Sequence, residues 1–301
     1  MRSVLAPAAP ERDSRAMTGT LLSFGHGYSA AALARRLVPR GWTVIGTTRD
    51  RARAAELGSA GVEPLVWPGE DPAPAIARAS HVLISVPPDA SGDPVLSAHA
   101  AGLCAAAPQW VGYLSTTGVY GDNGGDWVDE DSPLRPTTTR GRLRADAERA
   151  WLATGLPVHL FRLAGIYGPG RGPFAKVRAG TARRIIKPGQ VFSRIHVEDI
   201  AQVLEASIGR PAPGTAYNLC DDDPAPPEDV IAHAARLMGL PVPPAEDFET
   251  AEMSPMARSF YSDSKRVRND RIKRDLGVRL IYPDYRQGLA ALLAAEAGAG
   301  G

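Results

Sequence analysis

The sequence has little of what marks secreted, membrane-spanning or strongly charged proteins. Its 2 cysteines, Cys104 and Cys220, lack the spacing of a metal site, as do its 6 histidines. So few thiols exclude a disulfide-rich secreted domain and fit two small buried side chains in a cytoplasmic protein. No apolar run approaches the roughly 20 residues that cross a bilayer. We therefore expect neither a metal centre nor a membrane partner.

Neither sign of charge dominates the chain. Lys and Arg together number 34 and Asp and Glu 33, which gives a formal net charge of +1. This balance gives no electrostatic reason to expect binding to nucleic acid. The 301 residues suffice for a full hydrophobic core, in one large domain or in two lobes that share a cleft.

The most informative segment that is present is a glycine turn between two strand-like runs. Gly25, Gly27 and Ala30 fit the spacing G-x-G-x-x-A. In this spacing the first glycine allows a tight turn, the second lets the backbone approach a pyrophosphate, and the alanine keeps the helix close to the sheet. Tyr28 and Ser29 open that helix, whose exposed N–H groups and dipole would face the phosphates. The turn predicts a dinucleotide site.

The end of the second strand favours NADP(H) over NAD(H). Proteins that prefer NAD usually carry an acidic residue here for the ribose 2′-hydroxyl, whereas this chain has Thr48, Arg49 and Arg51 around Asp50. A guanidinium can bind a phosphate through two parallel hydrogen bonds. Asp50 keeps NAD(H) possible, because a shift of one residue would bring it into reach. Alternatively, both arginines are solvated charges at the start of a helix.

Strand-like and helix-like segments alternate, which predicts an α/β protein with a Rossmann-type doubly wound parallel sheet. Beside the run Leu21-Leu22, we expect strands at residues 42–46, 64–67, 81–86, 110–115 and 158–162. We expect helices at residues 30–37, 51–57, 73–79, 94–106 and 140–154.

The composition changes beyond Gly165, where Gly and Pro become frequent. We divide the chain into a disordered N-terminal tail at 1–19, an NAD(P)-binding Rossmann domain at 20–165, a substrate-binding lobe interleaved with the sheet at 166–292, and a flexible tail at 293–301. The first tail lacks the continuous apolar run of a secretory signal. Met17 stands just before the first strand and is an alternative start to Met1.

Five segments in a fixed order resemble the extended short-chain dehydrogenase/reductase superfamily, in its NAD-dependent epimerase/dehydratase family. They are the glycine turn and residues 114–121, 161–170, 194–201 and 216–219. Residues 85–89 and 264–266 point to an atypical, YeeZ-like branch. The resemblance implies a Rossmann fold, a nicotinamide cofactor, and a place beside that cofactor for Ser85, Val86 and Pro87.

The family's proton-transfer pair is absent from this chain. The family uses a Tyr, with a Lys four residues later that lowers the Tyr pKa, to exchange a proton while the nicotinamide exchanges hydride. Alignment on Gly141 and Glu148 puts Arg140 at the Tyr position and Arg144 at the Lys position. A guanidinium cannot deliver a proton near neutral pH. The resemblance leaves Arg144 to hold the nicotinamide ribose or an anion, or else to form a salt-bridged helix face.

Two hydroxyl residues are the remaining catalytic candidates. The resemblance puts Thr116 where the family keeps its hydroxyl partner. Tyr120, four residues later, is the candidate to replace the missing acid, although such a Tyr also serves to pack and shape the pocket. Without a neighbouring cation, the pKa of Tyr120 is expected to stay near ~10.

The resemblance also suggests substrate residues, namely Tyr167, Arg171, Arg194 and His196. Sugar-nucleotide enzymes of the family carry an Asn where this chain has Gly165, and often an Arg where it has Phe192. Arg194 is the candidate to compensate in part. Alternatively, the arginines are solvated and His196 only supports the pocket by hydrogen bonding.

We expect a pocket between residues 118–126, 167–174 and 194–196, at the nicotinamide end of the cofactor, because these segments follow strands. The sequence thus indicates an atypical NAD(P)-dependent oxidoreductase or epimerase/dehydratase-like enzyme for a small polar substrate, as a monomer or homodimer. The alternative is a non-catalytic NAD(P)-binding sensor or regulatory protein.

Overall fold

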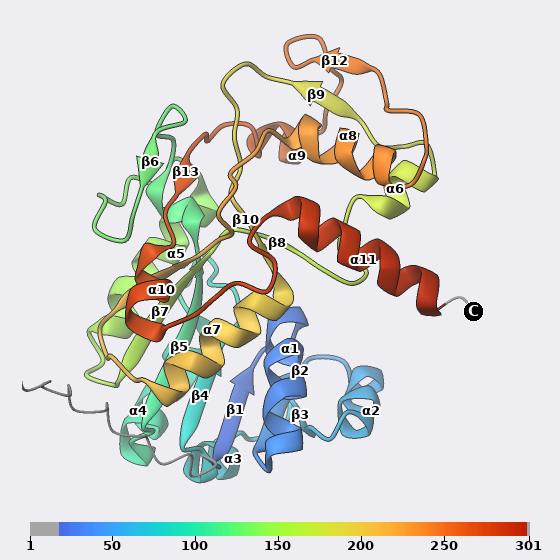
Figure 1. Cartoon of the computed structure of the whole chain (residues 1–301). Coiled ribbons are helices and arrows are strands. Elements are labelled where there is room, and N and C mark those ends of the chain that lie inside the picture. The colour runs from blue at the N-terminus through green and yellow to red at the C-terminus, as the bar shows by residue number, and fades with distance from the viewer. Residues whose placement is uncertain (1–17, 300–301) are drawn as a thin grey trace, which may run out of the picture.

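A parallel sheet of seven strands forms the centre of the computed structural model, which describes residues 18–299 (Figure 1). The strand order is β11-β7-β5-β4-β1-β2-β3. The strands are β1 (Thr20–Phe24), β2 (Thr43–Thr48), β3 (Glu63–Val66), β4 (His81–Ile84), β5 (Trp110–Thr116), β7 (Val158–Leu163) and β11 (Ala216–Leu219). The order reverses between β1 and β4, the point at which such sheets bind ligands beyond the carboxyl ends of their strands.

Helices cover both faces of the sheet. One face carries α1 (Tyr28–Leu37), α7 (Val197–Gly209) and α10 (Asp270–Leu276), and the other carries α3 (Ala73–Arg78), α4 (Pro94–Ala106) and α5 (Thr139–Leu152). Successive strand residues point to opposite faces, so Leu21 packs in the first layer and Leu22 in the second. A further helix, α2 (Arg51–Ser59), follows β2 and packs beside β3.

A smaller lobe has a core of its own, which includes Tyr167, Phe174, Tyr285 and Leu289. Its elements are β8 (Gly165–Tyr167), α6 (Phe174–Arg178), β9 (Arg184–Ile186), β10 (Arg194–His196), α8 (Pro227–Leu237), β12 (Ala245–Asp247), α9 (Pro255–Ser259) and α11 (Tyr285–Ala299). In Figure 1, most of this lobe lies beyond one end of the central sheet. Two short strands, β6 (Trp127–Val128) and β13 (Arg266–Val267), pair with each other.

The predicted α/β, Rossmann-type fold class is confirmed, and so is every strand and helix expected before residue 165. The structure adds β11, which was not among the expected strands and which pairs with β7 at the edge of the sheet. The chain therefore returns from the lobe to the sheet twice. It returns first in α7 and β11, and again in α10. The division into a Rossmann domain and a lobe at residue 165 stays a prediction.

Two predictions concern the ends of the chain. Residues 1–17 of the expected N-terminal tail lie outside the described residues. Residues 293–299 of the expected C-terminal tail continue helix α11, and their flexibility stays a prediction. Across residues 18–299, no helix combines the length and hydrophobicity needed to cross a membrane.

The expectation that both cysteines are buried is wrong for one of them. Cys220 follows β11 and is buried, whereas Cys104 is exposed. Its neighbour Leu103 takes the inward-facing position on α4 and is fully buried. A helix advances about 100° per residue, which turns Cys104 away from the sheet.

Candidate functional site

The turn between β1 and α1 has the backbone geometry of a phosphate-binding turn. Gly25 has a φ of +76°, and its N–H donates to Oγ1 of Thr47 at 2.7 Å. The N–H of Gly27 donates to the Gly25 carbonyl at 2.6 Å. A Cβ placed on Gly27 would meet only the Gly25 oxygen, at 3.7 Å. The space that a pyrophosphate needs is therefore open in front of Gly27, and these residues fit a dinucleotide.

The N-terminus of α1 faces this turn without a protein cap. Gly27 is the N-cap residue, and it makes no side-chain cap on the helix. The leading N–H groups of a helix have no partner within it, so those of Tyr28 and Ser29 are available to a phosphate. Ala30 is fully buried and holds the helix against the sheet.

Residues 85–87 lie beside the turn, as the resemblance implies. A Cβ on Gly25 would come within 3.0 Å of Val86 Cγ2 and 3.3 Å of the Ser85 carbonyl carbon. The N–H of Ser85 donates to the Phe24 carbonyl at 2.9 Å. These contacts bring the ends of β1 and β4 together at the reversal of strand order. No contact to a cofactor tests the assignment of Ser85, Val86 and Pro87, which stays a prediction.

The sequence interpretation did not assign a role to His26, the residue between the two glycines. Its side chain is buried against Gly46 of β2, where a Cβ would lie 2.8 Å from the imidazole Cγ. Burial, together with the nearby charge of Arg53, lowers the pKa of His26 to about 4. The neutral imidazole ring therefore packs the turn closely against Gly46 of β2. Gly46 was the available signal, because a glycine inside a strand often marks such a close approach.

The end of β2 separates the roles of Arg49 and Asp50. Asp50 is the N-cap of α2, where its Oδ1 accepts from the Ala52 N–H at 2.8 Å. Thr48 Oγ1 accepts from the Asp50 N–H at 3.2 Å. Arg49 is exposed, and no side-chain bond links it to the described part of the chain. The acidic side chain is thus engaged in the protein while the guanidinium is free.

Arg144 reaches from α5 to the carboxyl end of β5. Its Nη1 donates to the Leu114 carbonyl at 2.7 Å and to the Tyr113 hydroxyl at 3.0 Å. It forms no ion pair with any residue in 18–299, so the alternative of a salt-bridged helix face is wrong for this residue. Thr116 ends β5, and its Oγ1 accepts from the Gly118 N–H at 3.1 Å. The Thr116 hydroxyl proton remains available to a ligand.

Tyr120 lies inside the protein core rather than at an open surface. Its hydroxyl donates to Asn218 Oδ1 at 2.7 Å and accepts from Arg162 Nη1 at 2.9 Å. The side chain is 1% exposed. The expectation of an unshifted pKa is wrong: Arg162 is a neighbouring cation, yet burial raises the pKa of Tyr120 to about 12. These contacts hold Tyr120 as a structural residue, and they contradict its expected place facing the substrate.

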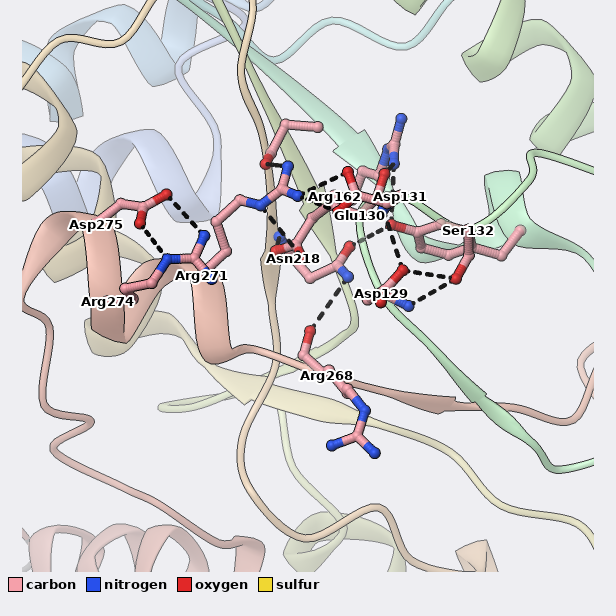
Figure 2. A network of polar contacts seen from close by, with 12 residues as sticks. Asp129, Glu130, Asp131, Ser132, Arg162, Asn218, Arg268, Arg271, Arg274 and Asp275 are labelled. Atoms are coloured by element: carbon pink, nitrogen blue, oxygen red, sulfur yellow. Dashed lines mark hydrogen bonds and ion pairs between the residues drawn. The ribbon is translucent and has the colours of Figure 1, made fainter.

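Arg162 and Asn218, the partners of Tyr120, belong to a wider network of polar contacts, which Figure 2 shows. Arg162 also donates to the Glu130 carbonyl and forms a buried ion pair with Glu148, with 2.8 Å between Nη2 and Oε2. Glu130 Oε1 accepts from the Asn218 N–H at 2.8 Å, and Arg271 lies 3.7 Å from Glu130 Oε2. The network fixes β7, β11 and the loop before α5 to one another.

Three of the four predicted substrate residues are turned into the lobe. Tyr167 packs in the lobe core beside Gly288, and burial raises its pKa. Arg194 Nη1 donates to the Phe192 carbonyl at 2.9 Å and to the Ala225 carbonyl at 3.0 Å. His196 Nδ1 caps α7 by accepting from the Glu198 N–H at 3.2 Å.

These three side chains do form one cluster, although it is buried. The rings of Tyr167 and His196 meet at right angles, 5.1 Å apart, and burial lowers the pKa of His196 to about 4. The carboxylate of Asp221 is nearby, and burial raises its pKa to about 8. Since Tyr120 bonds to Asn218 instead, the structure does not bring all the expected lining residues to one open pocket.

The fourth predicted substrate residue, Arg171, lies beside the phosphate-binding turn. Its guanidinium carbon is 5.4 Å from the ring centre of Tyr28, the first residue of α1. Two surface cavities, of about 430 and 540 Å³, lie elsewhere, one against the outer side of α5 and one between α3 and α4. Neither is lined by a predicted site residue.

The chain was compared with known protein families, sequences and solved structures. No family model matches the chain. Protein YeeZ of Escherichia coli K12 is 31% identical over 278 residues, which cover 86% of this chain and 95% of YeeZ. A conserved protein of unknown function from Silicibacter pomeroyi DSS is 62% identical in its solved structure, with a TM-score of 0.88 over 92% of this chain and 99% of that one. A proposed NAD-dependent epimerase/dehydratase from Methylobacillus flagellatus is 28% identical, with a TM-score of 0.68 over 93% of this chain and 99% of that one.

More distant structures share the fold and were solved with nicotinamide cofactors. A human epimerase family protein solved with NADPH is 17% identical, with a TM-score of 0.71 over 91% of this chain and 99% of that one. MoeE5, solved with UDP-glucuronic acid and NAD, is 20% identical, with a TM-score of 0.72 over 93% of this chain and 100% of that one. At these identities the likeness concerns the fold alone.

Proposed function

This chain belongs to the NAD-dependent epimerase/dehydratase family of extended short-chain dehydrogenases/reductases, in its YeeZ-like branch, and we propose that it is an atypical NADP(H)-dependent oxidoreductase acting on a small polar substrate. The observation that carries the proposal is the open turn at Gly27, where a Cβ would meet only the Gly25 oxygen. With the uncapped start of α1, this turn suits the diphosphate of a dinucleotide.

The proposal of NADP(H) rests on the different surroundings of Arg49 and Asp50 at the end of β2. Asp50 caps α2, where its Oδ1 accepts from the Ala52 N–H, so the acidic side chain that a 2′-hydroxyl would use is partly engaged in the protein. Arg49 stays exposed and can offer a planar guanidinium to a 2′-phosphate. Structures that share the fold were solved with NADPH and with NAD, so NAD(H) stays the alternative.

The site's own residues would orient the reactants rather than move the proton. The bound cofactor would supply or accept hydride. Arg144, which is bonded to the Leu114 carbonyl, would hold the nicotinamide ribose. The Thr116 hydroxyl would donate a hydrogen bond to an oxygen of the substrate. A guanidinium is not a proton donor near neutral pH, so the two arginines in place of the family's Tyr and Lys would not supply the proton. The proton that accompanies the hydride would therefore be exchanged with solvent.

A second function, a non-catalytic NADP(H)-binding sensor, is favoured by one observation. The tyrosine that was the candidate acid, Tyr120, is engaged by Asn218 and Arg162, and burial raises its pKa to about 12. No replacement for the family's acid is then evident in the part of the chain that the structure describes. A protein with this site would bind the dinucleotide and respond to its redox state without turnover.

Titration of the purified protein with NADPH and NADH tests the cofactor proposal. Gly27→Val fills the space of the diphosphate and should abolish binding of both. Arg49→Ala should weaken NADPH by about 1.5–3 kcal/mol, the contribution of a charged hydrogen bond, and leave NADH unchanged. Equal losses for both cofactors would reject the Arg49 assignment, and absence of binding to the wild type would reject the function.

Oxidation of NADPH with a panel of small carbonyl compounds separates the two functions. Turnover that Thr116→Val reduces, with NADPH affinity retained, supports the oxidoreductase. Tight NADPH binding without turnover of any compound, together with capture of a protein partner that depends on the cofactor's redox state, supports the sensor.

A further inference from the structure

A loop of the lobe is fastened to the start of the phosphate-binding helix. The hydroxyl of Tyr28 donates to the Pro169 carbonyl at 3.0 Å. Gly168 has a φ of +153°, and a Cβ there would overlap the Tyr28 hydroxyl and lie 2.8 Å from Val197 Cγ1. The loop therefore docks against α1 and α7 at a position that only glycine fits.

The same loop presents Arg171 beside the turn. Arg171 and Gly168 bond to each other in both directions, with N···O distances of 2.9 and 3.1 Å, so the loop is short and closed. The Arg171 guanidinium then lies over the ring of Tyr28, 5.4 Å from its centre. The side chain's position is thus set by contacts at both ends of the loop.

Arg171 has no anionic partner among the residues that the structure describes. The nearest acidic group to Tyr28, Glu198, is already paired with Arg35 at 2.6 Å. Arg171 is exposed, and a guanidinium stacked on an aromatic ring keeps its planar fork of donors free for a phosphate or carboxylate. An unpaired cation is therefore held against the side chain of Tyr28, the residue that follows Gly27 at the start of α1.

We propose that Arg171 is a ligand of the dinucleotide's diphosphate, held in place by the stacking and loop contacts of Tyr28. This inference rests on the proposed function, since it assumes that a dinucleotide occupies the turn. It replaces the earlier assignment of Arg171 to the substrate. Because Arg171 belongs to the lobe and the turn to the sheet, the bound diphosphate ties the two parts together.

Cofactor titration with Arg171→Gln tests the proposal. The variant should bind NADPH and NADH about 10- to 100-fold more weakly and by the same factor, as expected for a charged hydrogen bond to a group that both cofactors share. Arg171→Lys should recover part of the loss. Arg178→Gln is the matched control, because Arg178 is an exposed arginine of the same lobe that is paired with Glu296; it should bind both cofactors like the wild type.

Tyr28→Phe tests the positioning, because it removes the bond to Pro169 and keeps the ring. It should weaken both cofactors by a smaller factor than Arg171→Gln, with an unchanged melting temperature of the free protein. If the wild type binds NADPH and Arg171→Gln binds it equally well, the inference is wrong and the proposed function stands. Equal losses in Arg171→Gln and Arg178→Gln would show a non-specific charge effect and would also overturn it. Failure of the wild type to bind any dinucleotide would overturn both.

Discussion

The hydroxyl of Tyr120 donates a hydrogen bond of 2.7 Å to Oδ1 of Asn218, so a turn beside the expected site is joined to the edge strand of the sheet. Tyr120→Phe would leave Asn218 Oδ1 and Arg162 Nη1 without this partner inside the core. We expect a loss of about 1–3 kcal/mol in the free energy of unfolding, the cost of buried unsatisfied groups. Urea denaturation measures it.

The same variant distinguishes a structural Tyr120 from a catalytic one. If turnover is found, Tyr120→Phe should retain it with an unchanged pH–rate profile at temperatures where the variant stays folded. Loss of turnover without loss of stability would instead restore Tyr120 as the missing acid.

Breaking the buried ion pair of Arg162 and Glu148 should destabilise the protein more than breaking a surface pair on the same helix. The two side chains are 7% and 2% exposed, with 2.8 Å between Nη2 and Oε2. Glu148→Gln leaves a buried cation without its counter-charge and should cost about 3–5 kcal/mol in the free energy of unfolding.

Asp146→Asn provides the control on α5. Asp146 pairs with Arg149, but these side chains are 60% and 70% exposed, so its loss should cost at most about 1 kcal/mol. Urea denaturation of both variants compares them directly. A Glu148→Gln protein no less stable than Asp146→Asn would contradict the proposed weight of the buried pair.

The sequence was sufficient to predict the glycine turn and most strands of the sheet, because the signals for these elements are local. Gly25 supplies a positive φ, and the strands from β1 to β7 are short apolar runs between turns and helices, so their signals lie within a few residues of one another. The strand β11 was missed because its four residues, Ala-Tyr-Asn-Leu, carry little apolar pattern.

The orientations of the site side chains could not be read from the sequence. Where the Tyr120 hydroxyl points depends on Arg162 of β7 and Asn218 of β11, which only the folded sheet brings together. Arg194 likewise bonds to the Phe192 and Ala225 carbonyls, one of them across the lobe. One signal was available: Arg162 is a charged residue in a strand of buried residues, which predicts an internal partner.

Histidines that are buried in the neutral form should lower the stability of the protein in acid. Burial lowers the pKa of His26, His81 and His196 from 6.5 to about 4. Below about pH 6.5 these histidines are protonated in the unfolded chain, whereas in the folded protein they stay neutral down to about pH 4. The contribution of these histidines to the free energy of unfolding should therefore be constant above about pH 6.5 and fall from there to about pH 4, by about 1.4 kcal/mol per pH unit for each histidine. Asp221, whose pKa burial raises to about 8, acts in the opposite direction.

His81→Phe tests this origin, because the Phe ring can keep the packing against Trp42 and Trp110. The variant should lose the share of the acid slope that one histidine contributes, whatever its stability at neutral pH. Urea denaturation at several pH values gives the slope. An acid slope identical to that of the wild type would exclude His81 as a source.

Nucleotide sugars should bind poorly to this protein, although MoeE5, solved with one, shares its fold. Gly165 and Phe192 stand where the family's sugar-nucleotide enzymes carry polar side chains, and Arg194 cannot compensate because it donates to the Phe192 and Ala225 carbonyls. The diphosphate of such a substrate would then lack its usual charged ligand. We expect dissociation constants weaker than about 1 mM for UDP- and GDP-sugars, measured by calorimetry in saturating NADPH. Phe192→Arg supplies a candidate ligand and should tighten binding. Micromolar binding of any nucleotide sugar to the wild type would contradict the prediction and return the chain to the sugar-nucleotide enzymes.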